Sequence, residues 1–96
     1  MSNQDIEAKC FLCGHNAVYN ETDYANRRFY QCTNPSCGEY EISRTAMHRL
    51  KNSNEFKEIA IRKANKCLDT NEILEIIVDK NNRITTTFKL RSSGPG

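Results

Sequence analysis

Two stretches, CFLCGH at residues 10–15 and CTNPSCGEYEIS at residues 32–43, decide the fold of this chain. Each carries two closely spaced cysteines, so the four thiols follow the pattern C-x2-C-x18-C-x4-C. Two residues between the first pair let both sulfurs point at one ion while backbone amides donate to them. A tetrahedral zinc ion accepts four thiolates, and such a set leaves no open coordination position. The spacing therefore predicts one structural Zn²⁺ ion, bound by Cys10, Cys13, Cys32 and Cys37.

Disulfides or reduced core thiols are the alternatives to a metal site, and iron is the alternative occupant of a four-sulfur site. Residues 1–7 have neither the basic nor the apolar stretch of a signal peptide, and no apolar run approaches the ~20 residues of a membrane span. We therefore expect a cytoplasmic protein, in which thiols stay reduced. Five cysteines, an odd number, also suit disulfides poorly.

The chain is short and polar, with 96 residues of which 38% are hydrophobic. This length predicts one small domain, or a very small domain with an appendage. A core of this size is marginal, and small domains commonly add a metal or disulfides as staples. A structural zinc site contributes about 10–16 kcal/mol of folding free energy, so we expect the metal to carry much of the stability.

Local patterns predict short strands around the cysteine turns, at residues 17–20, 27–32 and 40–42. Gly14 and Gly38 each follow the second cysteine of a pair, where we expect a turn with positive φ. Ser43 is the expected N-cap of a helix over residues 44–51.

Helical spacing of apolar residues predicts a second helix over residues 55–68, with Phe56, Ile59, Ala60, Ala64, Cys67 and Leu68 on its apolar stripe. Two β-rich runs, residues 72–78 and 84–90, flank a turn and predict a hairpin that covers this stripe.

The expected fold class is α+β, a small zinc ribbon of short antiparallel strands around the four-cysteine site followed by two helices and a C-terminal β-hairpin. We expect the ribbon to span residues 1–43. Residues 44–91 then form the helical segment with the hairpin packed on it, and residues 92–96 a flexible tail.

The fifth cysteine and the two histidines are better explained as ordinary structural or surface residues than as metal ligands. Cys67 falls on the apolar stripe of the second helix, so we expect a buried free thiol. His15 is an alternative ligand in principle, but four cysteines already complete a tetrahedral set. His48 is expected to be a surface or packing residue. With no open metal position and no deaminase pattern around either histidine, we expect no enzymatic activity.

The run YQCTNPSC at residues 30–37, followed by EYEIS at residues 39–43 and a helix, resembles phage late transcription activators of the Ogr/Delta type. Those zinc fingers carry an aromatic-containing strand, then Cys-x-Asn-x-x-Cys, then an aromatic and a β-branched residue. The resemblance covers residues 9–50 and implies zinc binding by the four cysteines and a role in transcription. The 18-residue gap is shorter than the family pattern. The string CGEYEIS also looks like zinc-ribbon modules fused to larger bacterial effector proteins.

Charge is divided unevenly along the chain. Residues 44–68 carry a net charge of +5, from seven Lys and Arg against two Glu, whereas residues 10–43 carry −2. A zinc tetrathiolate adds about two negative charges to the ribbon. A basic helical segment beside an acidic ribbon is compatible with two functions.

The first is a nucleic-acid-binding transcriptional regulator, with DNA or RNA as partner. Basic side chains would meet phosphates and an aromatic side chain would stack on a base. The candidate contacts are Arg27, Arg28, Tyr30, Arg44, Arg49, Lys63 and Lys66.

The second is a protein-interaction or dimerisation module that binds no nucleic acid. In it the Ile73–Leu90 hairpin presents an edge strand to a second copy or to a protein partner. Such a module is also expected as a fragment of, or adaptor for, a larger bacterial or phage protein.

Overall fold

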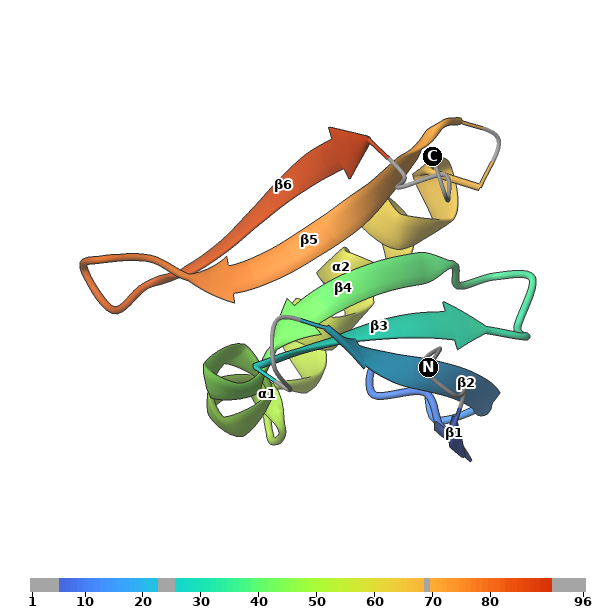
Figure 1. Cartoon of the computed structure of the whole chain (residues 1–96), viewed down its shortest axis with the longest axis horizontal. Coiled ribbons are helices and arrows are strands. Elements are labelled where there is room, and N and C mark those ends of the chain that lie inside the picture. Colours follow the sequence, from blue (N-terminus) through green and yellow to red (C-terminus); the bar gives the residue numbers. More distant parts are fainter. Residues whose placement is uncertain (1–5, 23–25, 69, 91–96) are drawn as a thin grey trace.

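The computed structural model describes residues 6–22, 26–68 and 70–90. Six strands form one sheet in the order β1-β2-β3-β4-β5-β6 (Figure 1). The strands are β1 (Ile6–Lys9), β2 (Asn16–Thr22), β3 (Arg27–Cys32), β4 (Glu39–Ser43), β5 (Glu72–Val78) and β6 (Ile84–Leu90). Neighbours pair antiparallel except β4 and β5, which run parallel. The fold is α+β, as expected.

Two helices, α1 (Arg44–Leu50) and α2 (Asn54–Lys66), connect β4 to β5. A parallel pair needs a long crossover, and the two helices supply it. The expected hairpin forms with its expected bounds, but its arrangement differs from the expectation. Because β5 pairs with β4, the hairpin extends the sheet of the cysteine-bearing strands instead of only covering a helix.

The core lies between the central strands and the helices. Tyr40 pairs with Leu74 and Ile42 pairs with Ile76 across the parallel ladder, and all four side chains are fully buried. Both helices contact β4 and β5 on this face. The helices contribute small or medium side chains to the core, namely Ala46, Leu50, Ala60 and Ala64. Alanines in α2 let its backbone approach the sheet closely.

Helix α1 begins where the sequence predicts, whereas α2 begins one residue earlier and ends two residues earlier than the predicted range of 55–68. Ser43 caps α1 as predicted, because its Oγ accepts a hydrogen bond of 3.1 Å from the N–H of Ala46. The α2 stripe was predicted too wide. Ile59 is 47% exposed and Leu68 44% exposed, so these two lie off the buried face.

Strand β1 was not predicted. Of its four side chains only that of Ala8 is partly shielded, so the segment lacks the alternating burial that marks a strand in sequence. The expected tail at residues 92–96 lies outside the described residues. Within the described ranges, no helix has the length and apolar character needed to cross a membrane.

Candidate metal centre

The four cysteines meet because two hairpin loops lie at the same end of the sheet. The loop between β1 and β2 holds Cys10 and Cys13, while Cys32 ends β3 and Cys37 lies in the loop that leads to β4. In an antiparallel sheet, alternate connections lie at the same end. The sheet register therefore brings together thiols that are far apart in the sequence.

The four sulfur atoms lie within 4.8 Å of one another. Cys10 Sγ is 3.9 Å from Cys37 Sγ, and Cys13 Sγ is 3.3 Å from Cys32 Sγ. A tetrahedral ion with Zn–S bonds of ~2.3 Å requires sulfur separations of ~3.8 Å, so the cluster fits one ion with small adjustments. All four cysteines are free thiols, since disulfide sulfurs are bonded at ~2.05 Å. The geometry can hold a metal ion.

Backbone amides support the sulfurs. The N–H groups of Leu12 and Cys13 donate to Cys10, and those of Asn34 and Gly38 donate to Cys32 and Cys37 respectively. The first loop closes through a bond of 2.9 Å from Gly14 N–H to the Cys10 carbonyl. Gly14 has φ of +82°, so the predicted left-handed turn is confirmed there.

Tyr40 extends the site into the core. Its Oη lies 3.2 Å from Cys10 Sγ, and it donates to that sulfur once the sulfur is a thiolate. Burial raises the pKa of Tyr40, so the hydroxyl keeps its proton at neutral pH. Tyr40 stacks on Tyr30 with ring centroids 5.2 Å apart, which holds the hydroxyl in place.

The thiols do not titrate alike. The hydrogen bond from Cys37, with burial opposing it and Tyr40 assisting, lowers the pKa of Cys10 well below its usual range. The same contact raises the pKa of Cys37, and burial raises the pKa of Cys32. A metal ion binds cysteine as the thiolate, so metal binding at this cluster must displace thiol protons.

Helix α2 holds the second cysteine loop, a contact that the sequence did not predict. Asn65 Nδ2 donates to the carbonyls of Pro35 at 2.9 Å and Cys37 at 2.8 Å. Gly38 lies so close to the helix that a Cβ there would be 2.5 Å from the Ala64 carbonyl oxygen. The expectation of positive φ at Gly38 was wrong, and the glycine is needed for close packing instead.

The other sulfur and the nearby histidine stay outside the cluster. Cys67 is buried and its thiol lies 3.5 Å from the Lys63 carbonyl, which confirms the predicted buried free cysteine. Burial raises the pKa of this thiol. His15 is exposed, and its Nδ1 is 3.3 Å from Asn34 Nδ2.

The basic pair of β3 is divided between the two faces of the sheet. Arg27 Nη1 lies 2.6 Å from Glu75 Oε2 and 3.5 Å from Glu41 Oε1. Arg28 points to the other face, where its guanidinium lies 4.4 Å from the centre of the Tyr19 ring. Consecutive strand residues alternate in direction, so these two arginines do not form one surface.

Tyr30 is only 3% exposed and lies between the rings of Tyr19 and Tyr40. Stacking of a base on Tyr30 would require the ring to leave the core. The Arg28 guanidinium donates to the Tyr30 hydroxyl, and this bond raises the pKa of Arg28.

The remaining candidate nucleic-acid contacts lie on the helices. Arg44, Arg49 and Lys66 are exposed, and Lys63 is partly buried. Two of the four already have protein partners, since Arg49 donates to Asn82 and Lys63 donates to Thr86.

Comparisons with protein-family models, with curated proteins and with solved structures found no match to this chain.

Proposed function

We propose that the cysteine cluster holds one structural zinc ion, and that the fold it stabilises presents a basic helical layer to nucleic acid as a small transcriptional regulator. Zinc suits the cluster because it accepts four thiolates without a geometric preference of its own. Four protein ligands leave no position for a substrate, which supports a structural role over a catalytic one.

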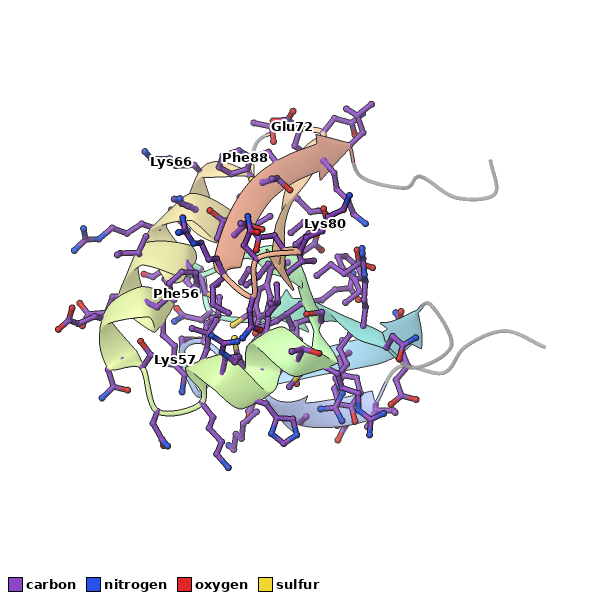
Figure 2. All side chains as sticks on the ribbon, turned by 90° about the vertical axis from the view of Figure 1, so that its left-hand side faces the viewer. Phe56, Lys57, Lys66, Glu72, Lys80 and Phe88 are labelled. Carbon is purple, nitrogen blue, oxygen red and sulfur yellow. The ribbon has the colours of Figure 1, made fainter. Side chains whose placement is uncertain are left out.

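The nucleic-acid part of the proposal depends on one observation, the excess of positive charge on the helical side of the sheet. On the side without helices, the carboxylates of Glu41 and Glu75 are paired with Arg27 and Lys89. On the other side, α1, α2 and their flanking residues carry seven cations and two anions. Lys57 and Lys66 both lie on this helical side (Figure 2).

The proposed surface therefore differs from the one expected from sequence. Arg27 is no longer a candidate contact because it is held in an ion pair with Glu75, and Tyr30 is no longer one because it is buried. Arg44 and Lys66 are exposed, at the start of α1 and the end of α2, and of the four helix candidates they are the two not already used in the bonds to Asn82 and Thr86, so we assign the phosphate contacts to them.

Salt-dependent binding to a fluorescent oligonucleotide duplex or single strand tests this proposal. The slope of log K against log salt falls by about 0.9 for each phosphate contact on duplex DNA. Replacing both Arg44 and Lys66 with Ala is expected to flatten the slope by up to about two contacts. Zinc content should not change, because neither residue belongs to the four-cysteine cluster.

The matched control replaces Lys80 and Arg83, two exposed cations of the β5–β6 turn, with Ala. This control removes the same charge and should keep the parent slope. Equal losses in both double variants would show a net-charge effect without a helical binding surface. No binding by the parent at ~50 mM salt would refute the nucleic-acid function.

A further inference from the structure

Strand β6 ends the sheet, and no strand within residues 6–22, 26–68 and 70–90 pairs with its outer edge. It spans seven residues, Ile84–Leu90, without a proline, and its one-to-one register with β5 contains no bulge. Natural edge strands are usually shortened, bulged or guarded by charge. In β6 the one charged residue, Lys89, is paired with Glu41 and Glu75, so it does not guard the edge.

The hairpin register shows which backbone groups face outward. Asp79 N–H donates to the Arg83 carbonyl at 2.8 Å, so these two residues form a hydrogen-bonded pair. Hydrogen-bonded and non-bonded pairs alternate along an antiparallel ladder. Thr85, Thr87 and Lys89 therefore bond to β5. The backbone N–H and C=O groups that face away from the sheet belong to Ile84, Thr86, Phe88 and Leu90.

The same edge carries exposed apolar side chains. Phe88 is 48% exposed and Leu90 is 70% exposed. Ile59 in α2 and Leu68 just after it are a little under half exposed, so four of the five large exposed hydrophobic residues in the described chain belong to β6 or the α2 region. Figure 2 shows Phe88 and Lys66 toward the same end of the molecule. Clustered exposed apolar residues commonly mark protein interfaces.

We propose that a second copy of this chain pairs with β6 in antiparallel orientation, with the two-fold axis at Thr87. Thr87 is the midpoint of Ile84–Leu90, so this register uses every residue of the strand. Thr86 of one copy faces Phe88 of the other, and Ile84 faces Leu90. Every outward-facing backbone group of β6 then has a partner, and the two sheets join into one.

In this register the side chains that face each other across the two copies of β6 are compatible in charge and polarity. Leu90, the most exposed of the large hydrophobic residues, lies opposite Ile84 of the other copy. Lys89 faces Thr85, so no two cations oppose each other within the paired strands. Thr87 faces its own copy across the axis, and threonine pairs are favourable in antiparallel ladders. The strand is thus complementary to itself, which favours a second copy over an unrelated strand.

Sedimentation equilibrium over a wide concentration range, with zinc bound, tests the proposal. The parent is expected to show a reversible monomer–dimer equilibrium. Thr86→Pro removes an outward N–H and the hydroxyl that accepts from Lys63, but it breaks no backbone bond to β5, so the variant should fold and stay monomeric. Phe88→Lys places a charge at the interface and should give the same result by a different route.

Ile6→Lys is the matched control, because Ile6 is an exposed apolar residue on β1 at the opposite edge of the sheet. This control should dimerise as the parent does. Amide exchange then checks the register, since the N–H groups of Thr86 and Phe88 should exchange slowly only in the dimer. A parent that stays monomeric at all concentrations would overturn the proposal. So would a dimer that survives Phe88→Lys and Thr86→Pro, or one that is lost in Ile6→Lys.

Discussion

At the scale of single residues, the contact between Tyr40 and Cys10 links the sulfur cluster to the core. The Tyr40 hydroxyl lies 3.2 Å from Cys10 Sγ and is itself fully buried. Groups that hydrogen-bond to metal ligands fix their orientation and balance their charge. Tyr40 is therefore a positioning residue for the proposed zinc ion.

Replacing Tyr40 with Phe should lower the affinity for zinc by about 10-fold, because the Cys10 thiolate loses the hydroxyl that donates to it. A competition titration with a chromogenic chelator measures this change. Tyr30→Phe is the control, since it removes a hydroxyl one strand away that bonds to Arg28 and not to a sulfur. Equal zinc affinities in the two variants would show that the hydroxyl does not support the site.

At the scale of elements, the docking of α2 on the second cysteine loop joins the two halves of the chain. Asn65 donates to two carbonyls of that loop, and Gly38 lets the helix backbone come close. This contact couples the end of α2 to the loop that carries Cys37.

Gly38→Ala should destabilise the zinc-loaded protein by about 1–3 kcal/mol, because the new Cβ would overlap backbone atoms that have little freedom to move. Urea unfolding monitored by circular dichroism measures the loss. Gly14→Ala is a useful comparison, because nothing lies within 4 Å of a Cβ there and only the positive φ opposes the change. It should cost about 1–2 kcal/mol. An unchanged midpoint for Gly38→Ala would mean that the helix can shift freely from the loop.

Local signals in the sequence explain which elements could be predicted. Cysteine spacing identified the four thiols that form the cluster, the Ser43 cap gave the correct start of α1, and the two β-rich runs gave the correct bounds of β5 and β6. The parallel pairing of β4 with β5 could not be predicted, because it joins residues more than thirty positions apart with no local mark. The roles of Gly38 and Asn65 depend on the same long-range packing.

Surface properties were the least predictable part of the candidate sites. The run Arg27-Arg28-Phe29-Tyr30 looks like a basic aromatic patch in sequence. Alternation along β3 sends the two arginines to opposite faces and turns Tyr30 into the core. Burial of Tyr30 follows from its two tyrosine neighbours, which become adjacent only when the sheet forms.

At the scale of the whole molecule, one sheet runs from β1 to β6 (Figure 1). The sulfur cluster lies at the loops that join β1 to β2 and β3 to β4. The fully buried side chains are few, with Tyr40, Ile42, Leu74 and Ile76 among the largest. A core of this size is marginal without a staple. The central claim is therefore that one zinc ion at the four cysteines is required for the fold.

The most direct measurement is thermal unfolding of the whole chain by near-UV circular dichroism, before and after removal of metal by a chelator, with bound metal counted by elemental analysis. We expect one zinc ion per chain and a cooperative transition that is lost with the metal and restored by adding zinc. Cys32→Ser should behave as the metal-free protein, whereas Cys67→Ala should bind zinc as the parent does. A metal-free protein that keeps its near-UV signal and its melting temperature would contradict the claim.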